Sequence, residues 1–291
     1  ANSLFASVEK KINDKHSLNF TSIFAENSRG KSSPNTDEVN NLKGTEYNSY
    51  WGWQDGRKRN SRDKDILEPI NILSHYWKIN DKTTLNTNVA YQLGHVGNSR
   101  LDYQSANNPD PTYYQNLPSY YYNNPDFNTP DPNTGVLPTD ETLANFLADG
   151  QINWNAMYVE NTKSSNNGKA VYSLYEDRND DRQFTANTVL FSSIANNITL
   201  NASASYRKLK SHNYQKMIDL LGADYFLDVD PFYTGDRAQS DLNNPSRQIK
   251  EGDEYGYNYN LLADVIDGFT QFKFRYKKAD FYLSQSYSRS D

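Results

Sequence analysis

The side chains that could do chemistry in this sequence are aromatic residues grouped with charged ones. These candidate ligand-binding residues are Tyr50, Trp51, Trp53, Arg57, Tyr113, Tyr114, Tyr120, Tyr121 and Trp154. Tyr and Trp present large flat faces with a polar tip, which suits stacking on sugar rings or gripping a peptide backbone. The alternative is structural, with the rings packing one loop against another. The sequence leaves both interpretations open.

No catalytic arrangement accompanies these aromatics. The four histidines, His16, His75, His95 and His212, are scattered and lack the spacing of a zinc site. There is no Gly-rich phosphate loop and no Gly-x-Ser-x-Gly turn around a nucleophile. We therefore expect no enzyme activity, no catalytic residue, no metal site and no cofactor.

One acidic segment leaves a question about calcium. Asp219, Asp224, Asp228 and Asp230 could supply oxygen ligands, but they lack the ordered spacing and central Gly of an EF-hand loop. The sequence does not decide whether an ion binds between Asp219 and Asp230.

The elements that must position these groups are β-hairpins. Tight turns are expected near residues 12–15, 79–82, 195–197 and 276–279, and Asn or Asp in the first three favours the backbone geometry of a turn. Apolar and polar residues alternate on both sides of each turn, which is the period of a strand with two different faces. The first turn, for example, separates Leu4, Ala6 and Val8 from Leu18 and Phe20.

Long segments connect these hairpins. They are expected near residues 27–65, 98–181 and 212–262, whereas connections longer than about 15 residues are uncommon in compact domains. Short turns at one end and long loops at the other are typical of bacterial outer-membrane barrels, whose loops are extracellular. Within the loops, residues 139–150 and 213–221 are predicted to form short helices, because each range ends near a Gly.

Composition narrows the class of protein. The chain has 291 residues, is 14% aromatic and has a mean hydropathy of −0.92, and no stretch approaches the roughly 20 apolar residues of a membrane helix. A barrel wall combines such polarity with many aromatics, since only alternate side chains meet lipid. A net charge of −6 argues against nucleic acid as a partner.

The segments 47–62, 108–114 and 117–121 resemble the barrel region of TonB-dependent receptors of the Bacteroidota. The resemblance implies a 22-stranded barrel in the outer membrane, closed by a plug domain, that imports a siderophore, an oligosaccharide or other glycan, or a peptide. It also implies outer-membrane lipid and the TonB complex as partners, the latter through the plug. This chain contains no recognisable plug domain and no TonB box.

The fold class predicted is therefore all-β: residues 1–291 form a partial antiparallel transmembrane β-barrel of about eight strands, with short helices in its extracellular loops. The first and last strands both adjoin a short turn, which places both chain ends on the extracellular side and indicates a section of a wider wall. The predicted function is part of a receptor whose loop aromatics capture a solute. Two alternatives are a barrel whose loops bind a protein partner, such as a surface lipoprotein or an adhesion or secretion component, and a secreted carbohydrate-binding β-sandwich.

Overall fold

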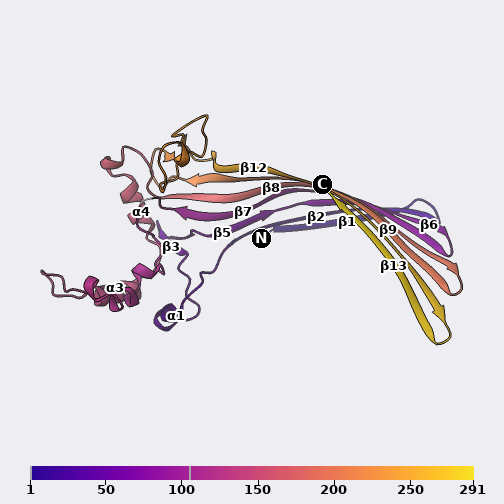
Figure 1. Cartoon of the computed structure of the whole chain (residues 1–291), viewed down its shortest axis with the longest axis horizontal. Coiled ribbons are helices and arrows are strands. Elements are labelled where there is room, and N and C mark those ends of the chain that lie inside the picture. Colours follow the sequence, from indigo (N-terminus) through magenta and orange to yellow (C-terminus); the bar gives the residue numbers. More distant parts are fainter. Residues whose placement is uncertain (1, 105) are drawn as a thin grey trace.

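A computed structural model describes residues 2–104 and 106–291 and shows one long antiparallel sheet with irregular segments at one end (Figure 1). The strand order is β1-β2-β5-β7-β8-β9-β12-β13, and β6 continues the position of β5 because both pair with β2 and β7. The nine strands thus occupy eight positions. They are β1 (Asn2–Lys11), β2 (His16–Gly30), β5 (Asp63–Leu67), β6 (Ile70–Asn80), β7 (Thr83–Asp102), β8 (Ser173–Ala195), β9 (Ile198–Asp219), β12 (Glu254–Tyr276) and β13 (Ala279–Ser290).

The four expected turn segments each join two neighbouring strands at the same end of the sheet (Figure 1). The strands run much further from these turns than the sequence suggests. β7 continues to Asp102, β8 begins at Ser173 and β9 continues to Asp219, so long parts of the expected loops are strand.

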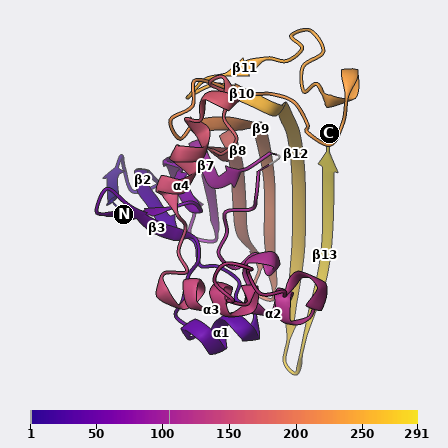
Figure 2. The same cartoon turned by 90° about the vertical axis from the view of Figure 1, so that its left-hand side faces the viewer.

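The connections at the other end hold the short elements (Figure 2). The expected helix at 139–150 is present as α3 (Pro138–Ala148), one residue earlier, with Pro138 in its first turn. The helix expected at 213–221 is wrong, because residues 213–216 of β9 pair with both β8 and β12 and the pairing with β8 continues to Asp219. The remaining elements are α1 (Asp37–Lys43), β3 (Trp51–Gln54), β4 (Arg57–Asn60), η1 (Tyr114–Asn116), α2 (Pro118–Tyr122), η2 (Pro125–Phe127), α4 (Trp154–Asn161), η3 (Ser164–Asn166), β10 (Phe226–Leu227), η4 (Gly235–Ala238) and β11 (Gln248–Ile249).

Register gives the sheet two contrasting faces, because side chains alternate along a strand. One row is apolar across seven strands and ends at Arg289 on β13: Val8, Phe20, Leu73, Val89, Ala186, Tyr206 and Ile266. The adjacent row on the other face is entirely polar: Glu9, Asn19, Ser74, Asn88, Asn187, Ser205, Asp267 and Ser288. We call the two sides the apolar face and the polar face.

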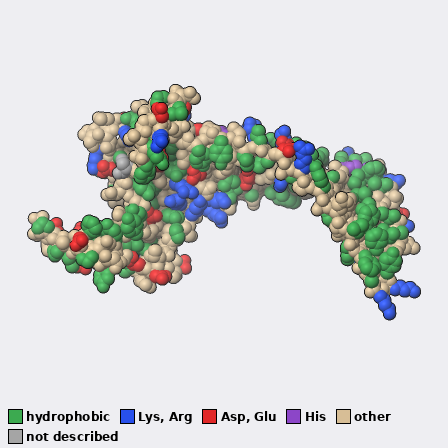
Figure 3. All heavy atoms as spheres, in the orientation of Figure 1, with side chains coloured by type: hydrophobic (Ala, Val, Ile, Leu, Met, Phe, Trp, Pro, Cys, Tyr) green, Lys and Arg blue, Asp and Glu red, His purple; other side chains and the backbone are tan. Residues whose placement is uncertain are grey.

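The sheet also divides along its length. We call residues 2–24, 70–93, 182–210 and 262–290 the turn half and the rest the loop half. In the turn half the sheet is a single layer: every buried hydrophobic side chain of the described residues lies in the loop half. Hydrophobic side chains gather on the surface near the turns (Figure 3). In the described residues, no helix is both long and apolar enough to cross a membrane.

A break separates β5 from β6 where the two halves meet. Pro69 lacks an N–H and cannot donate to a ladder, so the pairing with β7 skips from Leu67 to Ile70. Opposite the break, Gly94 has φ +154, and a Cβ there would lie 1.9 Å from the Leu67 carbonyl oxygen. Only a glycine lets the two backbones approach this closely.

Candidate functional site

The first predicted aromatic group forms a small hairpin of β3 and β4. Trp51 and Trp53 meet edge to face with ring centroids 5.8 Å apart, and the Lys58 ammonium lies 4.2 Å from the Trp51 ring centroid. The Arg62 guanidinium lies 5.2 Å from the ring of half-buried Tyr50. Trp53 is 54% exposed, so its ring is available to a ligand.

Arg57 lies on the outer end of the same hairpin. It is exposed and lines a hollow of about 570 Å³ with Lys58, Arg59 and Tyr158. Together with the tryptophans, this hairpin offers cations beside aromatic faces, an arrangement that suits anionic or hydroxylated solutes.

The four predicted tyrosines come together in a second cluster. Ring centroids lie 4.6 Å apart for Tyr113 and Tyr114, 5.6 Å for Tyr114 and Tyr120, and 5.2 Å for Tyr120 and Tyr121. Tyr120 also stacks on Phe127. Among the described residues, no ring contact joins this cluster to Trp51 and Trp53.

Trp154, the last predicted ligand contact, is fully buried. Its indole Nε1 donates to the Arg59 carbonyl oxygen at 3.2 Å, and the Arg59 guanidinium lies 4.2 Å from its ring centroid. The ring packs with Ile152, Met157 and Leu221 in a small core. In this arrangement Trp154 holds the loops together instead of offering a surface to a solute.

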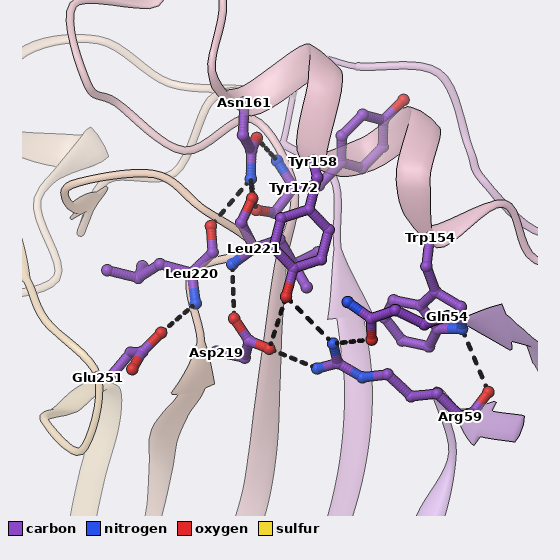
Figure 4. A network of polar contacts seen from close by, with 10 residues as sticks. All are labelled: Gln54, Arg59, Trp154, Tyr158, Asn161, Tyr172, Asp219, Leu220, Leu221 and Glu251. Atoms are coloured by element: carbon purple, nitrogen blue, oxygen red, sulfur yellow. Dashed lines mark hydrogen bonds and ion pairs between the residues drawn. The ribbon is translucent and has the colours of Figure 1, made fainter. Parts of the chain in front are cut away.

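Arg59 connects three separate segments of the loop half (Figure 4). Its guanidinium donates to Asp219 at the end of β9 at 2.6 Å and to Gln54 of β3 at 2.8 Å, and it reaches the Tyr158 hydroxyl of α4 at 3.3 Å. Because both charged side chains are about three-quarters buried, water screens this ion pair less than a surface pair.

Asn161, at the end of α4, acts as a second connector (Figure 4). Its Nδ2 donates to the carbonyl oxygens of Tyr172, Leu220 and Leu221 at 2.8 to 3.2 Å, and its Oδ1 accepts from the backbone N–H groups of Val171 and Tyr172. The side chain is 1% exposed. It satisfies backbone groups that would otherwise be buried without partners.

The strand ends are covered on both faces. Leu174 and Tyr175 are neighbours in β8 and therefore point to opposite sides. Leu174 packs with Trp154 and Met157 below α4, whereas Tyr175 packs against a core of Met217, Phe226, Ile249 and Tyr255 formed by the segment after β9. Arg100, Tyr175 and Gln215 share the polar face through their register with Asn88 and Ser205.

A groove of about 540 Å³ opens on this polar side, between the strand ends and the segment 226–232. We take this polar-face groove as the candidate binding site. Its lining combines two guanidinium groups, two amides, carboxylates and aromatic rings: Arg62, Arg100, Leu101, Asp102, Tyr103, Gln104, Tyr175, Gln215, Phe226, Asp228, Val229, Asp230, Pro231, Phe232, Ser240, Tyr255 and Gly256.

Burial shapes the electrostatics of this groove. It raises the pKa of Asp102 above the ordinary value and raises the pKa of Tyr175 to about 12. The pKa of Tyr255 is raised furthest for the same reason, and its hydroxyl has no hydrogen-bond partner among the described residues. Arg100 is held by Asp177 at 2.9 Å. The Tyr255 hydroxyl is therefore uncharged and buried behind the groove, where a missing hydrogen bond is costly.

The sequence did not point to the groove. Arg100, Asp102 and Tyr175 lie in what was expected to be the loop 98–181, and Gln215 and Tyr255 in the loop 212–262. The available signal was the alternation itself: counting by twos from Asn88 and Ser205 places Arg100 and Gln215 on the polar face.

The acidic segment is engaged in other contacts. Asp219 pairs with Arg59, and Asp228, which is 3% exposed, pairs with Arg247 at 2.9 Å. Asp230 accepts from the Phe232 backbone N–H. Across residues 2–104 and 106–291, no three His, Asp or Glu side chains gather as a metal site would require. The contacts of these carboxylates therefore do not support a calcium site between Asp219 and Asp230.

No protein-family model and no curated protein matches this sequence. Among solved structures, it is similar to the ferric-catecholate import receptor Fiu of Escherichia coli K12, with a TM-score of 0.41 and 11% identity. The likeness covers 99% of this chain and 34% of that receptor, so the chain spans about a third of its length. Ferric-catecholate import is a property of that protein.

Proposed function

We propose that this sheet is a section of an outer-membrane β-barrel wall, with its apolar face toward lipid and its polar face toward an aqueous interior. The observation that supports this most is the single-layer turn half. A sheet with one apolar face must bury it, and here no second sheet or helix of the described residues covers it.

The apolar surface that the turn half exposes is too large for a protein surrounded by water. On the apolar face, Leu4, Val8 and Leu283 are each 65% exposed or more. Burying one such side chain fully is worth roughly 1.5–3 kcal/mol, and the row through Val8 and Ile266 contains seven apolar residues. Lipid provides that burial. A stacked β-sandwich, which would bury these rows in a dry interior, fits this geometry poorly.

The height of the apolar band agrees with a bilayer. Along β9 it extends from Ile198 to Tyr206, after which Lys208 and Lys210 follow on the same face. These nine residues match the roughly 9–11 residues of a tilted transmembrane strand. The rings of Tyr91, Phe184 and Tyr206 lie at its upper limit, as interfacial aromatics do.

We propose further that the loop half captures a small solute on its way to the interior. The polar-face groove lies on the side that would continue into the barrel, and the Arg59 and Asn161 contacts hold its surrounding loops in place. Siderophores, oligosaccharides and peptides all present groups for its amides, guanidinium groups and rings. A 22-stranded barrel, a plug and coupling to the TonB complex belong to the same proposal.

The lipid arrangement can be tested by single-cysteine labelling, since the chain contains no cysteine. In the full-length protein in vesicles, Ser205→Cys on the polar face should react with a water-soluble maleimide. Ala204→Cys, its neighbour on the apolar face, should stay unreacted until detergent is added. Equal labelling of both positions in vesicles would contradict the proposal.

Solute capture has a separate test. Uptake of a ferric catecholate, an oligosaccharide and a peptide would be compared in cells with and without the protein. Uptake of one class should require the protein and fall at least tenfold in Arg100→Ala, which alters the groove. If none of the three depends on the protein, capture of these classes is wrong.

A second candidate function is binding of a protein partner such as a surface lipoprotein. The arm around α2 and α3, which projects from the sheet (Figures 1 and 2), favours it. In this arm Tyr122 is 76% exposed and Phe127 is 59% exposed. Exposed aromatics are typical anchors of protein interfaces. Tyr122→Ser with Phe127→Ser should abolish co-purification of such a partner and leave uptake unchanged.

A further inference from the structure

Two cations lie directly opposite each other on the apolar face, at its boundary with the loop half. Arg182 of β8 and Lys210 of β9 are register partners, and both are exposed. Like charges placed opposite each other on neighbouring strands repel and destabilise a sheet. Lys208, one row nearer the turns on the same face, is paired with Asp264 at 3.9 Å.

The acidic groups nearby do not neutralise this pair. Within the described residues, neither Arg182 nor Lys210 has an ion-pair partner. Asp180 lies one row further on, but its Oδ1 accepts from Arg178 at 2.7 Å and its Oδ2 from the Tyr214 hydroxyl at 3.0 Å.

The pair lines a hollow of about 330 Å³. Its other lining residues are Asp180, His212 and Asn260, all on the apolar face. The row below holds Tyr91 and Phe184, the upper limit of the apolar band. A group bound in this hollow would therefore lie next to the row of Tyr91 and Phe184, on the headgroup side of the proposed acyl-chain region.

We infer that Arg182 and Lys210 form a binding site for the phosphate of an anionic lipid headgroup in the membrane around the barrel. This inference rests on the proposed function, since it requires the apolar face to meet lipid. Phosphate oxygens accept from guanidinium and ammonium groups, and a negative charge between the two cations removes their repulsion. A lipid is favoured over free phosphate because its chains would cover the apolar residues just below.

The test is native mass spectrometry of the full-length protein in a neutral detergent, titrated with phosphatidic acid or with phosphatidylcholine. Arg182→Gln/Lys210→Gln is compared with Lys277→Gln/Lys278→Gln, which removes two exposed charges at the opposite rim of the band. The wild type and the turn variant should retain phosphatidic acid at least about fivefold more tightly than phosphatidylcholine. In the Arg182/Lys210 variant this preference should fall to about one.

Three results would overturn the inference: an unchanged preference in the Arg182/Lys210 variant, an equal loss in the turn variant, or displacement of phosphatidic acid by an equal concentration of inorganic phosphate. Stability provides a second measurement. In vesicles of phosphatidylcholine alone, the Arg182/Lys210 variant should be at least as stable to urea as the wild type, since it removes a repulsion. If the wild type itself does not insert into vesicles, the proposed barrel is wrong. This failure is distinct from a failure of the headgroup site, which only a protein that inserts can show.

Discussion

The loop half and the turn half of this sheet differ in what covers their apolar side chains. In the loop half, apolar side chains such as Leu174 and Met217 are buried under segments of the chain itself. In the turn half, Phe184 and Ala204 lie on the same two strands, β8 and β9, and are exposed without any cover from the described residues. Along these strands, apolar side chains are therefore covered by protein in the loop half. In the turn half, only the surrounding medium can cover them.

The difference shows that burial in such a protein depends on position along the strand. Polar residues follow the same division: both faces are polar near Asp177 and Arg178, but only one face is polar near Asn88. Each of the following substitutions tests one half against the other.

The largest effect is expected for Trp154→Ala in the loop half. Removing a fully buried Trp ring should cost about 3–5 kcal/mol of loop-half stability, because a cavity remains beside Met157 and Leu221. Hydrogen exchange of the amides in α4 and at Leu221 should measure it. Trp53→Ala, at an exposed ring, should change exchange little; comparable effects at both positions would contradict the structural role of Trp154.

In the turn half, Ala202→Arg should destabilise the sheet by about 2–4 kcal/mol, since it places a charge near the middle of the apolar band that is proposed to face lipid. Ser203→Arg, on the polar face, should have a much smaller effect. Urea titration of the full-length protein in phosphatidylcholine vesicles gives both values. Equal losses at the two positions would indicate that both faces meet the same environment.

Asn161→Leu should weaken the loop half by about 1–3 kcal/mol, because it leaves buried backbone groups without partners. Exchange of the Val171 and Tyr172 amides should accelerate. Asn155→Leu, at an exposed position of the same helix, is the matched control and should leave those amides protected.

The smallest effect concerns the pH dependence of Asp102. Burial raises its pKa in the folded state, so the folded chain holds this proton more tightly than the unfolded chain. The resulting stability is present below the ordinary pKa of 3.8 and is lost as pH rises through the raised value. Asp102→Asn should therefore raise the urea midpoint relative to the wild type at pH 7 but not at pH 3. A difference of the same size at both pH values would exclude this cause.

The turn half is the part that sequence reasoning could reach. Asn and Asp at the turns and alternation along residues such as Leu85 to Leu93 are local signals, and they identify strands wherever the two faces meet different environments. The upper part of β8, from Glu176 to Arg182, is polar on both sides. Without alternation, this stretch looks like a loop.

Tertiary pairing explains the other differences. Residues 213–219 have an acceptable composition for a helix, but ladders to β8 and β12 on either side determine a strand. The binding candidates were chosen by residue type, which cannot distinguish the buried ring of Trp154 from the exposed ring of Trp53. The groove needs three segments that are distant in sequence, so alternation can place Arg100 and Gln215 on one face but cannot reveal the groove itself.

Under the proposed lipid arrangement, the interruption at Pro69 limits how far hydrocarbon can extend along the sheet. Between Leu67 and Ile70 the regular ladder to β7 is broken: Pro69 has no N–H to donate, and its carbonyl oxygen accepts from the Leu93 N–H at 3.3 Å, so this stretch has fewer regular cross-strand partners. Hydrocarbon offers no replacement for such partners, whereas water or headgroups do. The seam lies next to Leu93, whose row on the apolar face also holds Arg182 and Lys210. In the proposed barrel, this break would therefore limit how deeply the sheet can enter a bilayer.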